Sequence, residues 1–363
     1  MIYHIYWGTS GNSGLYIDEI YQVLKRHGFS QKVFVNYYYP FDYGEKIFFK
    51  RGDIANSKHK GILRKLFQLQ EVLFGYIKIL IIACKDKPTL VNYSHVGQSY
   101  FYIVWFLRLI KKIAGIKLMV TCHDVTPHSE RRGEMHNRKK IFDVADYLLV
   151  HTDNSIKELR ELFGIKISKI VKHPFPIMNL SKLSAINTPI AKDTDFLFIG
   201  HLRKDKGIEF LLDAWKDFYK MNKRATLKVC GRKLSDIDFD ENDLSKYNIE
   251  FKLHYINDEE YYRYVKSARY VILPYIQGTN SGIISTVLSL GTDVITSDIP
   301  MFKENPMVLE SNIFISNDKQ SLLNTLQACW CQNHTDVSNL LNAYRKLFDE
   351  EVVAVYKLIA TYG

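Results

Sequence analysis

Residues 198–215, FIGHLRKDKGIEFLLDAW, indicate a buried strand, a short turn and a helix in close succession. The run that ends at Gly200 is strand-like, and Gly207 precedes a helix whose apolar residues recur on one face. Arg203 and Lys206 occupy the turn between them. Free N–H groups at a helix start favour an anion, and two added cations suit an anion with more than one charge. We therefore expect Arg203 and Lys206 to contact a phosphate; the alternative is a solvated basic turn.

The same strand–turn–helix unit recurs along the chain. The strand-like runs are YHIYW, KVFVNYY, PTLVNYS, KLMVTCHD and YLLVHT in a first series, and DFLFIG, ATLKVCG, IEFKLHYI, RYVILPY, TDVITSD and NIFIS in a second. Alternation of this kind is typical of parallel sheets covered by helices on both faces. The predicted fold class is α/β, with two Rossmann-like doubly wound domains that face each other across a cleft.

A looser stretch that contains proline and serine separates the two series. The predicted ranges are 1–175 for an N-terminal domain, 176–194 for a linker, 195–335 for a C-terminal domain and 336–363 for C-terminal helices, which could pack back on the N-terminal domain. Ligands of such folds bind at the carboxyl ends of strands, where the connections reverse direction. The turns that follow strands are therefore the places to look for a site.

The turn after the first strand is rich in glycine. Gly8, Gly11 and Gly14 remove side chains where the backbone enters the first helix, so a phosphate or sugar could approach the main-chain amides. The spacing resembles a dinucleotide-binding fingerprint, but the acidic residue expected at the end of the second strand is missing. A tight turn without a ligand is the alternative.

The segment VTCHDVTPH places His123 and Asp124 at the carboxyl end of a buried strand. A histidine there could hydrogen-bond a ligand hydroxyl or handle a proton; the alternative is a structural histidine. No third ligand stands nearby at a suitable spacing, so we expect no metal site.

A polar loop follows the strand that ends at Pro274 and Tyr275. It holds Gly278, Thr279, Asn280, Ser281 and Gly282 and leads into a short apolar helix. Its hydroxyls and free amides also suit an anion. Two anion sites at strand ends of one domain are better explained by a single diphosphate than by two ligands.

Composition narrows the class of partner. The net charge of +10 and the isoelectric point near 9.1 point to an anionic partner: nucleotide phosphates, a lipid head group or nucleic acid. Nucleic acid is disfavoured because no recognition motif appears. Five scattered cysteines, no signal peptide and no apolar run of about 18 residues predict a cytoplasmic protein.

Segment 60–117 is both basic and apolar. It could rest on an anionic membrane surface, which would make the protein peripheral at the inner face of the cytoplasmic membrane. Packed helices with solvated lysines are the alternative.

Over roughly residues 1–310 the chain resembles GT-B glycosyltransferases, and it is similar to the large retaining group called glycosyltransferase family 4. FIGHLRKDKGIEFLLDAW is similar to the turn of that family whose Arg and Lys hold the donor diphosphate, here Arg203 and Lys206. PYIQGTNSGIISTVLSLGTDVITSD resembles the loop whose amides also touch the diphosphate, here Ser281 and Gly282. One departure is that the family's two glutamates, eight residues apart, are replaced by Gly278 and Thr286.

Two elements of the first half carry the same resemblance. VTCHDVTPH matches the family's H-D-x-x-P element, which implies that His123 lies beside the donor sugar. The loop at Gly11 and Gly14 resembles the one that closes over donor phosphate. The N-terminal domain would then bind the acceptor, and the C-terminal domain the nucleotide sugar.

The resemblance implies a retaining transfer of a hexosyl-type sugar from a nucleoside-diphosphate sugar to a hydroxyl acceptor, such as a polysaccharide or lipid-linked glycan intermediate. It implies no cofactor and no required metal; Asp124 is a candidate acceptor contact or base. Two alternatives remain: a nucleotide-sugar epimerase of the same fold, and a non-catalytic nucleotide-sugar-binding partner of a glycosylation complex.

Overall fold

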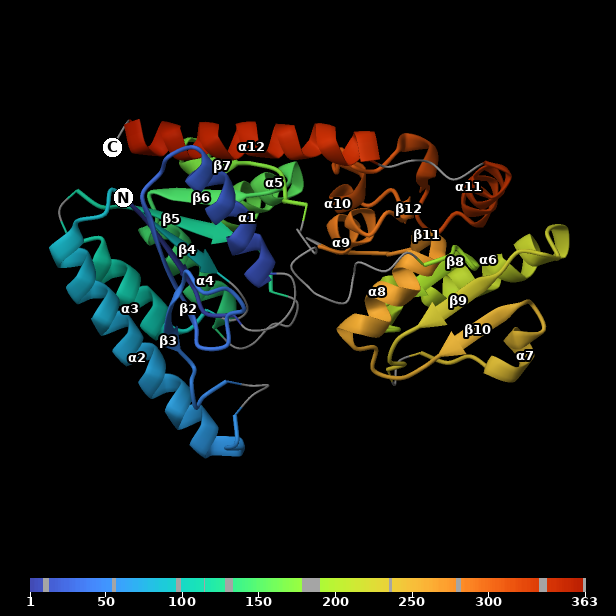
Figure 1. Cartoon of the computed structure of the whole chain (residues 1–363), viewed down its shortest axis with the longest axis horizontal. Helices are drawn as coiled ribbons and strands as arrows, with labels where there is room; N and C mark the ends of the chain where they lie inside the picture. Colours follow the sequence, from blue (N-terminus) through green and yellow to red (C-terminus); the bar gives the residue numbers. More distant parts are fainter. Residues whose placement is uncertain are drawn as a thin grey trace. The chain divides into compact units, whose positions relative to one another are not determined.

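The structure is a computed structural model that describes residues 1–8, 13–53, 57–95, 99–113, 115–127, 133–177, 190–234, 237–278, 282–332 and 338–361. The chain forms two compact units (Figure 1). The first comprises Met1–Pro176 and Leu347–Gly363, and the second comprises Ile177–Lys346. The chain therefore returns to the first unit within the predicted range 336–363.

The first unit is built on a parallel seven-stranded sheet of order β3-β2-β1-β4-β5-β6-β7. The strands are β1 (Ile2–Tyr6), β2 (Gln31–Asn36), β3 (Glu45–Phe48), β4 (Leu90–His95), β5 (Lys117–Cys122), β6 (Tyr147–Val150) and β7 (Ile170–Lys172). The helices are α1 (Ser13–Arg26), α2 (Gly61–Asp86), α3 (Phe101–Ile110), α4 (Glu134–Val144), α5 (Asp153–Phe163) and η1 (Ile167–Lys169). Helix α12 (Ser338–Thr361) begins in the second unit and belongs to the first from Leu347 onward. Strand order reverses between β1 and β4, as in a doubly wound sheet.

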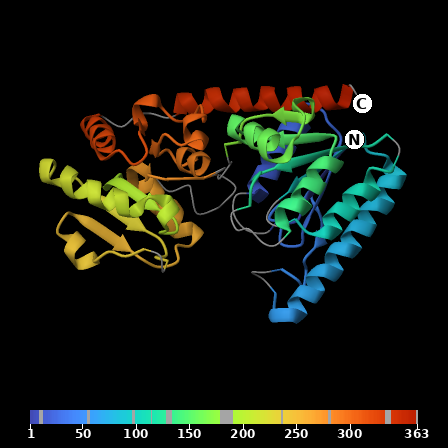
Figure 2. The same cartoon turned by 180° about the vertical axis from the view of Figure 1, so that it is seen from behind.

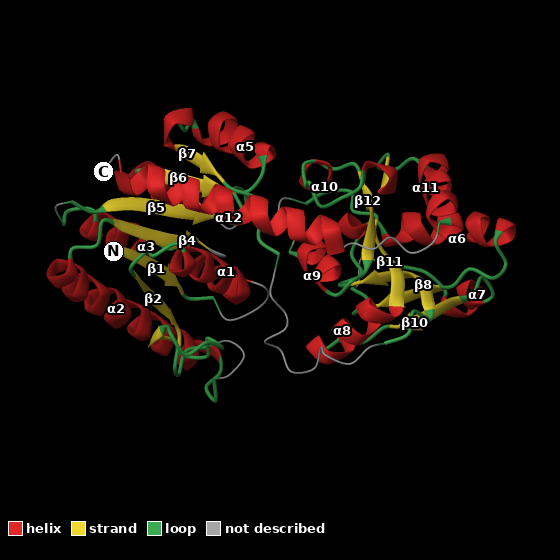
Figure 3. Cartoon of the chain, turned by 45° about the horizontal axis from the view of Figure 1, so that its top comes forward, coloured by secondary structure: helices red, strands yellow, loops and turns green. Residues whose placement is uncertain are grey.

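Helices cover both faces of this sheet (Figure 3). Helices α2, α3, α4 and α5 share one apolar core with the sheet, to which Tyr76 and Phe106 contribute rings stacked 4.0 Å apart. On α12, Tyr356 accepts a hydrogen bond of 3.0 Å from the Asn92 side chain of β4. Asp349 of the same helix pairs with Arg26 of α1 at 2.7 Å. The C-terminal part of α12 is thus fixed to the first unit by polar contacts.

The second unit contains a parallel six-stranded sheet of order β10-β9-β8-β11-β12-β13. Its strands are β8 (Thr194–Ile199), β9 (Leu227–Cys230), β10 (Ile249–Lys252), β11 (Ala268–Leu273), β12 (Asp293–Ser297) and β13 (Ile313–Phe314). Its helices are η3 (Lys204–Lys206), α6 (Ile208–Met221), α7 (Glu241–Ser245), α8 (Asp258–Ser267), α9 (Ile283–Ser289), α10 (Pro300–Lys303), η4 (Glu310–Asn312) and α11 (Lys319–Cys331).

The second series of predicted strands and helices folds as expected because its helices have an apolar face, and α6 is an example. Its expected apolar stripe is buried in the core of the unit, as Leu211, Trp215 and Phe218 illustrate. The Trp215 indole nitrogen, itself within this core, donates a hydrogen bond of 2.9 Å to the Tyr247 carbonyl. The predicted fold class, two doubly wound α/β domains, is confirmed.

The sequence contains no uninterrupted apolar run of about 18 residues, but α2 as a whole is long and apolar. By length and composition alone Gly61–Asp86 could cross a membrane, with a mean hydropathy of 1.6 in its most apolar stretch. Glu71 and Lys78 interrupt the apolar run in the sequence but lie within one continuous helix. Two isolated charges do not end a helix, because Glu and Lys are themselves good helix formers.

Candidate functional site

The turn between β8 and α6 is packed directly against the loop that follows β11. Gly207 has φ +65, and a Cβ atom built on it would lie 1.8 Å from the Pro274 carbonyl oxygen. Glycine is therefore required at 207 both by its backbone conformation and by the close approach. The Ile276 amide donates a hydrogen bond of 2.9 Å to the Asp205 carbonyl, which joins the two strand-end segments.

Arg203 and Lys206 lie in this joined region with a carboxylate between them. The Arg203 guanidinium donates through Nε and Nη2 to the two carboxylate oxygens of Asp205, at 2.8 and 2.5 Å. Lys206 Nζ lies 3.9 Å from Asp205 and 3.7 Å from the centre of the Tyr275 ring. The sequence alone does not identify Asp205 as a site residue, because there it is only the residue between Lys204 and Lys206.

The surroundings of Lys206 change the pKa of its ammonium group. Burial lowers the pKa of Lys206 to about 8, although the Asp205 carboxylate acts in the opposite direction and the Arg203 charge adds to the lowering. A doubly charged anion at this place would restore the ammonium form, because opposite charge favours the charged state. The turn is thus electrostatically suited to a phosphate.

Of the loop after β11, Gly278 and Gly282 are described, whereas the candidates Thr279, Asn280 and Ser281 lie outside the described residues. Gly282 precedes α9, and the buried Thr286 hydroxyl donates to the Gly282 carbonyl at 2.9 Å. A Cβ atom on Gly278 would lie 2.9 Å from Met301 Sδ. Neither position that replaces a family glutamate therefore carries a carboxylate, and Thr286 is engaged within its own helix.

The remaining candidates belong to the first unit. His123 directly follows β5; its Nε2 lies 2.9 Å from Ser94 Oγ, and its ring makes an edge contact with Tyr16 at 4.7 Å. The half-buried Asp124 holds its main-chain carbonyl 2.5 Å from the Arg138 guanidinium. Gly14 lies in α1, where its carbonyl accepts a hydrogen bond of 3.4 Å from the Tyr39 hydroxyl. Gly11 lies outside the described residues.

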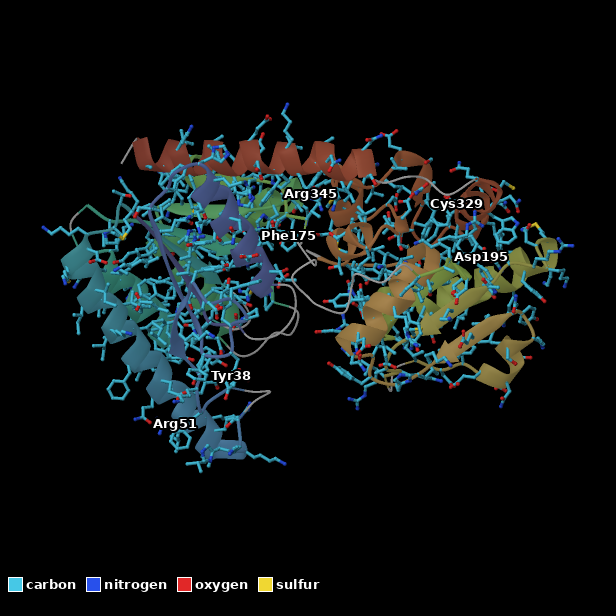
Figure 4. All side chains as sticks on the ribbon, in the orientation of Figure 1. Tyr38, Arg51, Phe175, Asp195, Cys329 and Arg345 are labelled. Carbon is cyan, nitrogen blue, oxygen red and sulfur yellow. The ribbon has the colours of Figure 1, made fainter. Side chains whose placement is uncertain are left out.

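His123 is one of three histidines that each directly follow a strand. His151 follows β6 and His173 follows β7, with ring centroids 5.7 Å from His123 to His151 and 5.1 Å from His151 to His173. Phe175, labelled in Figure 4, lies 5.2 Å from His151. The signal for His151 was its position at the end of a predicted strand, whereas His173 follows β7, a strand that the sequence did not predict.

Burial keeps the side chains of His151 and His173 neutral at neutral pH. The pKa of His151 is lowered to about 4 and that of His173 to about 3, in both cases chiefly by burial. His151 Nδ1 lies 3.0 Å from the His173 carbonyl. Among the described residues, no three His, Cys, Asp or Glu side chains are placed to share a metal ion.

Comparisons with known proteins agree with this architecture. Residues 193–331 match the model of the family described as "Glycosyl transferases group 1". No curated protein sequence matches the chain significantly.

Solved structures share the fold at low sequence identity. A glycosyltransferase from Rickettsia africae ESF-5 is 15% identical, with a TM-score of 0.63 over 99% of this chain and 98% of that chain. An E. coli structure named for trehalose-6-phosphate and bound with UDP-2-fluoro glucose is 8% identical, with a TM-score of 0.61 over 99% of both chains. The UDP-GlcNAc 2-epimerase from Methanocaldococcus jannaschii is 15% identical, with a TM-score of 0.55 over 100% of both. The family match assigns residues 193–331 to a group 1 glycosyltransferase domain, and the whole chain shares the two-domain GT-B fold of these solved structures.

Proposed function

We propose that the protein is a retaining hexosyl-type transferase that moves a sugar from a nucleoside-diphosphate sugar to a hydroxyl acceptor. The proposed acceptor is a polysaccharide or lipid-linked glycan intermediate, met at the inner face of the cytoplasmic membrane. The observation that carries the proposal is the contact of the Arg203–Lys206 turn with the segment Pro274–Ile276. This contact sets two cations where two strands end, the usual place of a ligand in such sheets.

The chemistry required is stabilisation of a leaving diphosphate. Negative charge grows on the departing oxygens while the sugar gains positive character, and fixed cations aimed at those oxygens lower the barrier. Arg203 and Lys206 would supply this charge, so the proposal includes no metal and no cofactor. Asp205 occupies the Nε–Nη2 edge of the Arg203 guanidinium, so the phosphate would either displace that carboxylate or bind the Nη1–Nη2 edge.

The other residues take supporting roles in the proposal. His123 would orient the donor sugar, and Asp124 would contact the acceptor or act as a base. Amides of the loop 279–282 would hold the diphosphate together with Lys206. The loop with Gly11 and Gly14 would cover the donor phosphate. The Ser94 hydroxyl at 2.9 Å and the Tyr16 ring support the role of His123, because they fix the direction of its imidazole.

A nucleotide-sugar donor is supported by the E. coli structure, since that protein of the same fold is bound with UDP-2-fluoro glucose. The identities of the nucleotide and the sugar can be found by thermal-shift screening of UDP, ADP and GDP sugars. The donor that raises the melting temperature is then incubated with candidate acceptors, and glycosylated product is sought by mass spectrometry. Failure of every nucleotide sugar to bind would overturn the proposal.

A second candidate is epimerisation of the donor sugar, because the M. jannaschii epimerase has the same fold. The two reactions differ in their need for an acceptor. Transfer requires an acceptor and yields a glycosylated product, whereas epimerisation converts the sugar without one. Incubation of the bound donor alone, followed by chromatography of its sugar, therefore separates the two candidates.

A further inference from the structure

Helix α2 has two apolar faces, and one of them is exposed. Val72, Tyr76, Ile79 and Ala83 face the sheet and are fully buried. The opposite side carries what we name the apolar stripe: Leu63, Leu66, Phe74, Ile77 and Ile81, of which Phe74 is 63% and Ile81 is 67% exposed. These residues recur at multiples of three and four along the helix, so they lie on one face, where Gln70 is the polar residue between Leu66 and Phe74. Scattered exposed apolar residues need no explanation, but a stripe along one face indicates a contact surface.

Helix α3 extends this surface on the neighbouring side of the unit. It runs beside α2, as Figures 1 and 2 both show, and it packs against α4 on its other flank. At the junction of α3 and α4 lies a pocket of about 440 Å³, named here the α3–α4 pocket. Phe101 and Trp105 supply aromatic walls, and Arg108, Lys112 and Lys140 supply positive charge.

The charge of this region is strongly one-sided. Residues 57–113 contain ten lysines and arginines against two acidic residues, so they hold a net charge of +8 within a chain of +10. Both acidic residues are already neutralised: Glu71 by Arg51, labelled beside α2 in Figure 4, at 3.1 Å, and Asp86 by Lys32. Among the described residues, none of the three cations of the α3–α4 pocket is engaged in an ion pair.

We propose that the apolar stripe and the α3–α4 pocket together dock the first unit on an anionic lipid bilayer. The stripe enters the boundary between head groups and acyl chains, and the pocket receives a lipid phosphate. Exposed apolar residues flanked by lysine and arginine are the composition that binds such interfaces, and Trp105 is suited to the head-group level. This proposal specifies which surface would hold the protein at the membrane named under the proposed function. It does not depend on whether the protein transfers a sugar.

The helix lies in the plane of the bilayer and does not cross it. To span, α2 would have to leave the sheet and expose Val72, Ile79 and the stacked pair of Tyr76 and Phe106. The free energy lost from that core would be large, whereas docking the outer face leaves the core intact. Only 28% of the most apolar stretch of α2 is buried, so most of it is available for contact.

A second copy of the chain is the competing occupant, and charge disfavours it. A symmetric dimer would place the same surface of each copy face to face. Each surface is cationic, so the two copies would repel each other, whereas anionic lipid would neutralise the charge.

The test is flotation of the full-length protein with vesicles of phosphatidylglycerol and phosphatidylcholine, compared with vesicles of phosphatidylcholine alone. We expect binding to the anionic vesicles at low salt, weakened as salt rises because the cations are exposed. The stripe variant F74Q/I77Q/I81Q should bind about tenfold or more weakly, since it loses apolar contact. Its matched control is L162Q/I167Q/M221Q, which changes equally exposed apolar residues elsewhere.

The pocket is tested separately with R108Q/K112Q/K140Q. Its control, R160Q/K166Q/R224Q, removes the same charge from exposed positions elsewhere. We expect the pocket variant to lose clearly more affinity for anionic vesicles than this control. Equal losses would overturn the role of the pocket.

The stripe proposal is overturned if the wild-type protein does not bind anionic vesicles at low salt, or if the stripe variant binds as well as its control. It is also overturned if the wild type is a dimer that the stripe variant converts to a monomer, without any vesicle binding. Circular dichroism melts confirm that each variant is folded. Because these assays measure no turnover, their failure would leave the proposed transfer reaction standing.

Discussion

Arg203 and Asp205, two residues apart, form a two-point ion pair in the turn after β8. Both side chains are partly exposed, so the pair itself contributes little to stability. Its importance is positional, because the Arg203 guanidinium that it engages is the proposed phosphate contact. Under the proposed function, the Asp205 carboxylate would partly neutralise the anion site before a phosphate binds.

Replacing Asp205 with Asn should therefore tighten the binding of nucleoside diphosphate. The amide removes a negative charge from the anion site, while the main-chain bond from Ile276 to residue 205 is kept. We expect an affinity gain of roughly twofold to fivefold, the scale of a partly exposed charge interaction. Isothermal titration with the preferred nucleoside diphosphate measures it. Weaker binding by the variant would show that Asp205 instead positions Arg203 for the ligand.

Arg203→Ala should reduce kcat/KM for the donor by an amount that corresponds to about 2–4 kcal/mol of transition-state stabilisation. Lys206→Ala should have a loss of the same order, since the proposed mechanism gives both cations the same role. Lys204→Ala is the matched control, because Lys204 is an exposed cation of the same turn. A variant at 203 with unchanged donor kinetics, or a control with an equal loss, would refute the assignment.

The pH dependence of donor use should report Lys206. With a pKa of about 8, its ammonium form prevails below that pH and disappears above it. The kcat/KM for the donor should therefore fall as the pH rises through about 8, because this ratio reflects groups of the free enzyme. Arg keeps its charge throughout this range, so Lys206→Arg should abolish the fall while retaining activity. A decline that persists unchanged in Lys206→Arg belongs to another group.

Whether a strand could be predicted from the sequence depends on how many of its residues contribute to a recognisable hydrophobic pattern. Most strands were predicted because each is a buried run between two helices. β3 and β7 were missed because β3 begins with Glu45 and Lys46 and β7 has only Ile170 and Val171 between lysines, so neither shows an apolar alternation like that of the four-residue edge strand β10.

For the site, the sequence predicted single positions but not their partners. Arg203 and Lys206 stood out as cations between a strand and a helix, whereas the pairing of Arg203 with Asp205 depends on side-chain geometry. The contact of Gly207 with Pro274 joins residues far apart in the chain, which periodicity alone does not reveal. His151 and His173 were missed because a lone histidine after a strand has no distinctive neighbour in the sequence.

Gly207→Ala should destabilise the second unit more than strain alone can explain. Gly291→Ala is the control, because Gly291 has a similar φ of +75 but no atom within 4 Å of an added Cβ. The control should lose about 1 kcal/mol of unfolding free energy through backbone strain. Gly207→Ala should lose at least about 2 kcal/mol more, since its methyl group meets the Pro274 carbonyl. Hydrogen exchange in peptides from β8 and β11 measures both, and equal losses would contradict the close contact.

Acid should destabilise the first unit through its buried histidines. Burial lowers the pKa of His4 and of His151 to about 4 and that of His173 to about 3, whereas in the unfolded chain each returns to about 6.5. Below pH 6.5 the unfolded state therefore binds protons that the folded state excludes. Stability is full above about pH 6.5 and should fall by up to about 1.4 kcal/mol per pH unit for each histidine as the pH drops toward 4.

His173→Gln should flatten this dependence, because glutamine keeps a polar side chain but does not titrate. The exposed His27 provides the control, since its replacement with glutamine removes a histidine without removing a buried one. Denaturant unfolding of the wild type and both variants at pH 7.5 and pH 5 measures the two slopes. Between pH 7.5 and pH 5 both rings stay neutral in the folded state, so the slope should fall by the share of one histidine. A slope equal to that of the wild type would mean that His173 is protonated in the folded state.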